Sequence, residues 1–159
     1  VESRLREALR NGVFGTFQKP VDNERLICSI KKSFSEGAVV LIADDDKELC
    51  SNLLDTFAEK GYRGVVVRDR ETAIRAASEK KFDIIILDMK LKDADGLETY
   101  QKIIDFRPDV QVVIITDNKQ ETESLFDQDS KNDICALLEK PLDIDNLLEV
   151  MQNALEDRN

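Results

Sequence analysis

Five side chains able to bind a metal ion or a phosphate group each stand at the end of a short apolar run. They are the carboxylates of Asp44 and Asp45 after residues 39–43, the carboxylate of Asp88 after 84–87, the hydroxyl of Thr116 after 112–115 and the ammonium of Lys140 after 135–138. Such runs are typical of parallel strands buried on both faces. Open α/β sheets bind ligands at the carboxyl ends of their strands. The sequence therefore predicts one site with three carboxylates, a hydroxyl and an ammonium.

The residue types in this site favour phosphoryl chemistry. Carboxylates at close quarters need a counter-charge, and ligand sets made only of oxygen suit Mg²⁺ better than zinc. A transferring phosphoryl group spreads its charge over three oxygens, which a metal, a lysine and a hydroxyl can share. The central carboxylate can then act as a nucleophile and form an aspartyl phosphate. The chain contains no histidine, which excludes Ser-His-Asp and Cys-His catalysis and zinc held by histidine.

The elements that must position these residues alternate along the chain from residue 38 onward. Strands are expected at 39–43, 64–68, 84–87, 112–115 and 135–138, and helices at 46–60, 71–80, 96–106, 122–131 and 143–156. Five such units with short loops predict a doubly wound α/β fold with a five-stranded parallel sheet. In the flavodoxin-like order 2-1-3-4-5, the strands that carry Asp44 and Asp88 are neighbours at the topological switch point.

Residues 1–37 repeat the last part of this pattern. Lys19-Pro20 corresponds to Lys140-Pro141, and Asp22 corresponds to Asp143 at the same spacing. We therefore predict that 1–37 are the helix–strand–helix end of a preceding domain of the same fold, and that 38–159 form a complete domain. The chain is then expected to come from a longer protein with two such domains in tandem.

The composition limits the partners that this chain can have. The net charge of −10 over 159 residues argues against a nucleic-acid surface. There is no apolar stretch long enough to span a membrane, and because the chain begins with charged residues we expect no signal peptide. Three scattered cysteines suit a reducing compartment, so we expect a cytoplasmic protein.

Residues 38–159 resemble the receiver domain of bacterial two-component response regulators, and 1–37 resemble the end of a second receiver. The resemblance rests on four stretches in register, at 40–46, 83–98, 108–116 and 139–143. It implies a phosphorelay signalling domain in which Asp88 accepts a phosphoryl group from a phosphohistidine. The donor would be a histidine kinase or a histidine phosphotransfer domain. The domain would catalyse only its own phosphorylation and dephosphorylation, and it could form a homodimer.

The resemblance also implies a role for each site residue. Asp45 and Asp88 would bind Mg²⁺ directly, Asp44 would bind it through water, and the backbone carbonyl of Lys90 would be a further ligand. The side chains of Thr116 and Lys140 would contact the phosphoryl oxygens and couple phosphorylation to movement. Asp46, the third acidic residue of the run, is expected to cap the helix that follows.

Three positions depart from the family pattern. Asp117 stands where a small residue usually follows the threonine, Leu137 replaces an aromatic residue, and Lys92 replaces a proline. Asp117 could repel the phosphodonor, and Leu137 puts the usual threonine–aromatic coupling in doubt. These departures leave open a receiver-like interaction module that is not phosphorylated. A phosphatase of the haloacid dehalogenase type is a third possibility, in which Asp46 would belong to the site and Asp88 would have no role.

Overall fold

The computed structural model describes residues 37–92, 94–126 and 134–157. The predicted end of a preceding domain at 1–37 lies outside the described residues, except for Gly37 at its boundary. No helix in the described part of the chain combines the length and apolar character needed to cross a bilayer.

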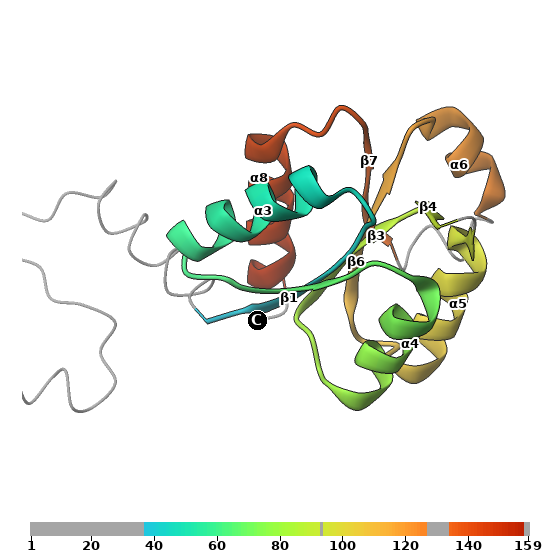
Figure 1. Ribbon diagram of the computed structural model, residues 1–159, viewed down its shortest axis with the longest axis horizontal. Coiled ribbons are helices and arrows are strands. Elements are labelled where there is room, and N and C mark those ends of the chain that lie inside the picture. The colour runs from blue at the N-terminus through green and yellow to red at the C-terminus, as the bar shows by residue number, and fades with distance from the viewer. Residues whose placement is uncertain (1–36, 93, 127–133, 158–159) are drawn as a thin grey trace, which may run out of the picture.

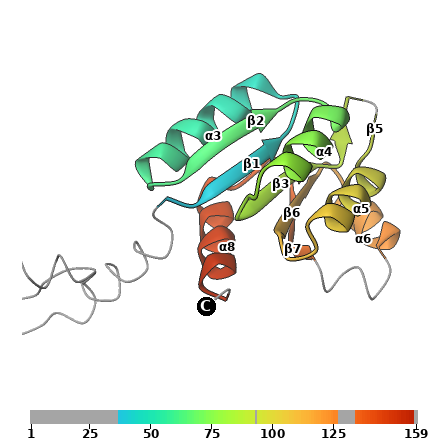
Figure 2. The same ribbon diagram turned by 90° about the horizontal axis from the view of Figure 1, so that it is seen from below.

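A single parallel sheet forms the centre of the domain. Its strands are β1 (Val39–Ala43), β2 (Arg63–Val67), β3 (Ile84–Asp88), β6 (Gln111–Thr116) and β7 (Ile134–Glu139). Their order is β2-β1-β3-β6-β7, which confirms the predicted pattern 2-1-3-4-5 (Figure 2). The second strand begins one residue earlier than predicted, because Arg63 pairs with Val39 at the start of β1.

Helices cover both faces of the sheet, as the doubly wound prediction requires. They are α3 (Lys47–Glu59), α4 (Arg70–Glu79), α5 (Gly96–Phe106), α6 (Lys119–Leu125) and α8 (Ile144–Glu156). Helices α3 and α8 lie on one face, and α4 and α5 lie on the other (Figure 1). Alternate residues of each strand point to opposite faces. Val40 and Ile42 therefore pack in the α3–α8 core, whereas Leu41 and Ala43 pack in the α4–α5 core.

Each described helix begins after an Asp or Asn whose side chain accepts a hydrogen bond from a backbone N–H of the first turn. These caps are Asp46, Asp69, Asp95, Asn118 and Asp143. They satisfy N–H groups that have no partner within the helix. The predicted start of a helix at residue 122 was wrong. Because Asn118 is the cap, α6 begins at Lys119, and it ends at Leu125. Residues 127–131 of that prediction lie outside the described part.

A small hairpin that the sequence analysis did not predict fixes the chain after β3. Strand β4 (Lys90–Leu91) pairs antiparallel with β5 (Ala94–Asp95). Gly96 closes the hairpin against Met89, where an added Cβ would lie 2.6 Å from the Met89 Cα. Lys92 has a φ of 43°, which proline cannot adopt, so this turn as it stands is incompatible with the proline usual at this position.

Candidate functional site

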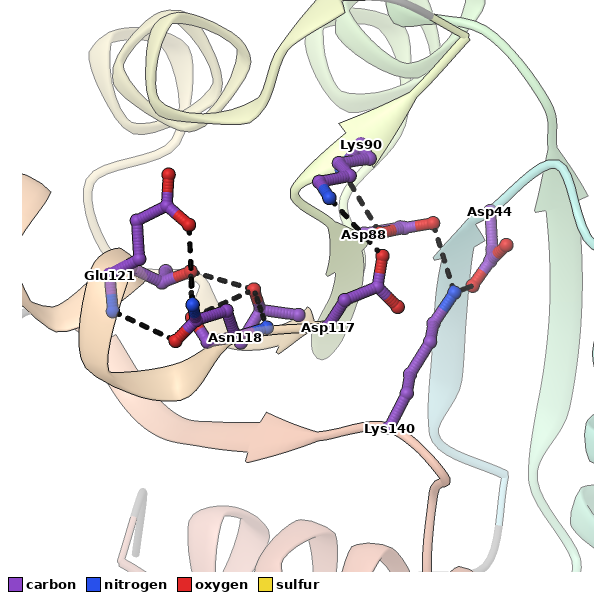
Figure 3. Close-up of polar contacts among 9 residues, drawn as sticks. Asp44, Asp88, Lys90, Asp117, Asn118, Glu121 and Lys140 are labelled. Carbon is purple, nitrogen blue, oxygen red and sulfur yellow. Dashed lines mark hydrogen bonds and ion pairs between the residues drawn. The ribbon is translucent and has the colours of Figure 1, made fainter.

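The strand ends bring the predicted site residues to one edge of the sheet. Asp44 follows β1, and Asp88 is the last residue of the adjacent strand β3. Thr116 ends β6, the next strand, and Lys140 follows β7 at the end of the sheet. The register explains the convergence, because Asp88 pairs with Ile115 and Thr116 pairs with Glu139. The side chains of Asp44, Asp88 and Lys140 point toward one another (Figure 3).

The Lys140 ammonium lies between two buried carboxylates. Its Nζ is 3.2 Å from Asp88 Oδ2 and 3.3 Å from Asp44 Oδ2. Partial burial of Lys140 opposes its positive charge, but the attraction of Asp88 and Asp44 outweighs this effect and raises the pKa of the ammonium. Lys140 is therefore charged at neutral pH and is held against the carboxylate of Asp88.

Asp44 is the most buried carboxylate of the site, with 1% of its surface exposed. Its Oδ1 accepts a hydrogen bond from the Asp46 N–H at 2.9 Å, whereas its Oδ2 accepts none and has only the ion pair with Lys140. Burial is the main cause that raises the pKa of Asp44. The Asp46 N–H and Lys140 oppose this rise, and the charge of Asp88 adds to it. An incompletely paired buried carboxylate is a costly feature that a cation would relieve.

Three carboxylates are close enough to share one ion. Asp44, Asp45 and Asp88 each offer an oxygen, and these oxygens lie within 4.8 Å of one another. Asp45 is exposed, whereas Asp88 is 4% exposed and accepts the backbone N–H of Lys90 on Oδ1 at 3.0 Å. Asp46 is not part of this group, because its carboxylate accepts the Leu49 N–H and caps α3.

Asp117 does not stand unpaired at the entrance to the site. Its carboxylate lies 3.5 Å from the ammonium of Lys90, two residues after Asp88 (Figure 3). Both side chains are more than half exposed, so water screens the pair and it adds little stability. Its consequence is electrostatic, because Lys90 partly offsets the negative charge that the sequence places beside Asp88.

If Asp88 accepts a phosphoryl group, as the resemblance implies, replacing Asp117 with asparagine should speed up phosphorylation by a small anionic donor. The neutral amide would no longer repel the donor, and Lys90 would be free to attract it. We expect the rate with acetyl phosphate to rise roughly two- to fivefold at low salt and the gain to shrink at high salt. The control is Asp109→Asn, an exposed acid just before β6, at the opposite edge of the sheet. An unchanged or lower rate for Asp117→Asn would contradict the repulsion.

The Thr116 hydroxyl is occupied by a residue that the sequence analysis missed. Thr116 Oγ1 lies 2.6 Å from Thr122 Oγ1, and both residues are buried. A local signal could have found Thr122. Asn118 and Glu121 have the spacing of a capping box, and Asn118 Oδ1 accepts the Glu121 N–H (Figure 3). A helix that starts there turns Thr122 back toward the end of β6.

Two other residues near the site have limited roles. Cys50 donates its thiol to the Asp44 carbonyl at 3.4 Å. Burial raises the pKa of this thiol to about 11, which keeps it protonated and unreactive. Leu137 is half-buried in β7 and lines a groove of about 250 Å³ with Glu123, Phe126, Ile134 and Ala136. Leu137 is aliphatic and offers no aromatic ring for coupling to Thr116.

Comparisons with known proteins agree with this geometry. A family model described as the response regulator receiver domain matches residues 40–152. The transcriptional regulatory protein ZraR of Klebsiella oxytoca is 30% identical over 76% of this chain, but the match covers 27% of ZraR. The chain thus spans about a quarter of the length of the curated relatives it matches.

Solved structures share the fold. A CheY-like receiver domain protein from Methanospirillum hungatei JF-1 superposes with a TM-score of 0.69 at 24% identity, over 77% of this chain and 96% of that one. The receiver domain of a sensor histidine kinase from Pseudomonas aeruginosa PAO1, which has a magnesium ion in its active-site cleft, gives a TM-score of 0.67. It is 21% identical over 76% of this chain and 98% of that one.

Proposed function

Because the chain belongs to the family of response regulator receiver domains, we propose that Asp88 is its phosphoacceptor. The observation that carries this assignment is the position of the Asp88 carboxylate at the carboxyl end of β3, 3.2 Å from the Lys140 ammonium and beside two further carboxylates. Receiver domains of response regulators are phosphorylated by histidine kinases. The donor proposed for this chain is a phosphohistidine of a histidine kinase or of a histidine phosphotransfer domain.

The donor set fits a magnesium ion. All the available ligands are oxygens, and Asp44 Oδ2 is a buried acceptor without a hydrogen bond. Asp45 and Asp88 would hold the ion directly, Asp44 through a water molecule and Lys90 through its backbone carbonyl. Bound there, Mg²⁺ would neutralise part of the charge on the phosphoryl oxygens. The magnesium in the Pseudomonas aeruginosa domain supports this choice of metal.

The chemistry proposed for the residues themselves is a single displacement. An oxygen of Asp88 attacks the phosphorus of the donor, the bond between phosphorus and the imidazole nitrogen breaks, and that nitrogen takes up a proton from water. The Lys140 ammonium already forms an ion pair with Asp88 Oδ2. It is therefore close enough to form an ion pair with a phosphoryl oxygen bound to Asp88. Thr116, at the end of the neighbouring strand, would donate its hydroxyl proton to another phosphoryl oxygen.

Two alternatives from the sequence differ in how well they fit the structure. The phosphatase interpretation needs Asp46 in the site, but its carboxylate caps α3, and the family model that matches is the receiver. A receiver-like module that is not phosphorylated remains a second candidate. It is favoured by one observation, the occupation of the Thr116 hydroxyl by Thr122.

We also propose that residues 38–159 are one complete receiver domain and that 1–37 are the end of a preceding receiver in a hybrid kinase or another multi-domain regulator. A cytoplasmic location and a homodimer belong to the same proposal. The family supports the cytoplasmic location, and the acidic composition disfavours nucleic acid as a partner of this segment.

The experiment that tests the proposed function is labelling of the chain with acetyl phosphate. Incubation with Mg²⁺ should add the mass of one phosphoryl group, and removal of the metal by EDTA should prevent the addition. Mg²⁺ with beryllofluoride, which mimics a phosphoryl group on a carboxylate, should change the amide NMR spectrum around Asp88. A chain that gains no mass and shows no spectral change would be the unphosphorylated module instead.

A further inference from the structure

Two buried threonines and the start of helix α6 share a closed set of hydrogen bonds. Thr116 and Thr122 are each 4% exposed, so water does not compete for their hydroxyls. Thr122 Oγ1 lies 2.6 Å from Thr116 Oγ1 and donates to the Asn118 carbonyl at 2.9 Å. The Asn118 N–H in turn donates to Thr116 Oγ1 at 3.2 Å. These contacts form a ring from the end of β6 to the first turn of α6.

The distances favour one direction for the hydrogen bonds of this ring. A threonine hydroxyl has one proton to donate and two lone pairs to accept with. Thr122 uses its proton on the Asn118 carbonyl, which is closer to it than to Thr116, 2.9 Å against 3.3 Å. The shorter of these two distances favours an arrangement in which Thr116 donates to Thr122. In the reverse arrangement, Thr122 donates to Thr116, and the Thr116 proton goes to the Asn118 carbonyl. While the ring is closed, Thr116 has no proton to donate to a phosphoryl group on Asp88.

Opening this ring would act directly on α6. Thr122 lies within that helix, and Asn118 caps it. Phe126, one turn after Thr122, is buried and packs edge-on against Tyr100 of α5, with ring centroids 5.4 Å apart. Phe126 also lines the groove that Leu137 borders. A movement of Thr122 can therefore be passed through Phe126 to the groove at the surface. This coupling does not need an aromatic residue at position 137.

We propose that Thr122 is a positioning residue that holds the Thr116 hydroxyl in the unphosphorylated state, and that phosphorylation of Asp88 opens the ring and shifts the first turn of α6. This inference rests on the proposed function. The proposal assigns to Thr122 the coupling role that the family pattern gives to an aromatic residue at the position of Leu137. The hydrogen bonds of the ring stabilise the unphosphorylated state, and the contact between Thr116 and the phosphoryl group stabilises the phosphorylated state.

The test measures beryllofluoride binding in the presence of Mg²⁺ by wild type, Thr122→Val and Thr122→Ser. Valine keeps the shape but removes the hydroxyl, so the Thr116 proton loses its 2.6 Å partner and keeps only the 3.3 Å contact with the Asn118 carbonyl. We expect Thr122→Val to bind beryllofluoride about three- to tenfold more tightly than wild type, the factor that one hydrogen bond supplies. Thr122→Ser keeps the hydroxyl and should return the affinity to the wild-type value. Equal affinities of wild type and Thr122→Val would overturn the proposal.

Thr99 provides a matched control. It is a fully buried threonine of α5 whose hydroxyl also donates to a carbonyl four residues earlier, that of Asp95, at 3.0 Å. Thr99→Val should lose a similar hydrogen bond without changing the affinity for beryllofluoride. If Thr99→Val tightened binding as much as Thr122→Val, the effect would come from the loss of any buried threonine hydrogen bond, and the proposal would fail.

Hydrogen exchange of the wild-type chain keeps the test decisive even if Thr122→Val does not fold. Beryllofluoride should speed up amide exchange in the first turn of α6, at residues 119–122, because the ring opens. Unchanged exchange there, with beryllofluoride bound, would refute the role of Thr122 but leave Asp88 as phosphoacceptor. If wild type binds no beryllofluoride at all, the proposed function fails and this inference fails with it.

Discussion

Replacing Asp88 with asparagine is expected to abolish labelling by acetyl phosphate. The amide is not a nucleophile at neutral pH, so no bond to phosphorus can form. The fold should survive, because the amide oxygen can still accept the Lys90 N–H and Lys140 keeps its ion pair with Asp44. Intact-mass spectrometry should show the phosphoryl adduct on wild type and none on Asp88→Asn, with circular dichroism spectra that superimpose.

The control for Asp88→Asn is the same chemical change at Asp46. Asparagine is as good a helix cap as aspartate, so α3 should be unaffected. Asp46→Asn should therefore be labelled like wild type if Asp88 is the acceptor. Labelling that survives in Asp88→Asn but is lost in Asp46→Asn would reverse the assignment and favour the phosphatase alternative.

Replacing Asp44 with asparagine is expected to stabilise the metal-free protein and to destabilise it relative to wild type once Mg²⁺ is added. In EDTA, the variant no longer buries a negative charge beside that of Asp88, and removing this cost should raise Tm by roughly 3–6 °C. Saturating Mg²⁺ should stabilise wild type by about 2–3 kcal/mol at a hundredfold excess over Kd. The variant should gain less, because it lacks one carboxylate.

The difference in stability between wild type and Asp44→Asn in EDTA should depend on pH, and the sign of this dependence can be derived. The pKa of Asp44 is raised in the folded state above its ordinary value of 3.8, chiefly by burial. Folding therefore favours the protonated carboxyl, and that contribution is present below pH 3.8 and is lost as the pH rises through the folded pKa. In EDTA, the advantage of Asp44→Asn over wild type should grow as the pH rises and should be smallest near pH 3.8.

The variant Asp45→Asn separates the effect on the stability of the metal-free protein from the effect on Mg²⁺ binding. Asp45 belongs to the same group of carboxylates but is exposed. Its replacement should weaken the response to Mg²⁺ without raising Tm in EDTA. Thermal unfolding of wild type and the two variants, with and without Mg²⁺, checks this. The metal assignment would be wrong if all three proteins responded equally to Mg²⁺.

The order of residues is enough to predict the sheet and the edge at which the site lies. Buried parallel strands need apolar residues on both faces, so their positions and ends are visible along the chain. Asp44 and Asp88 were placed together by that argument alone, because the carboxyl ends of neighbouring parallel strands coincide. Asp46 was also assigned correctly as a cap, since capping depends on residues close in the chain.

Which side chains meet within the site follows only from the folded chain. The Lys90–Asp117 ion pair joins residues from two different strand ends, and no local periodicity reports it. The Thr116–Thr122 contact depends on where α6 begins, and the prediction placed that start three residues too late. The Asp44 Oδ2, which has an ion pair but accepts no hydrogen bond, likewise results from burial by the whole fold. Contacts of this kind depend on the direction of side chains and on the register of elements distant in sequence, and tertiary packing alone sets these.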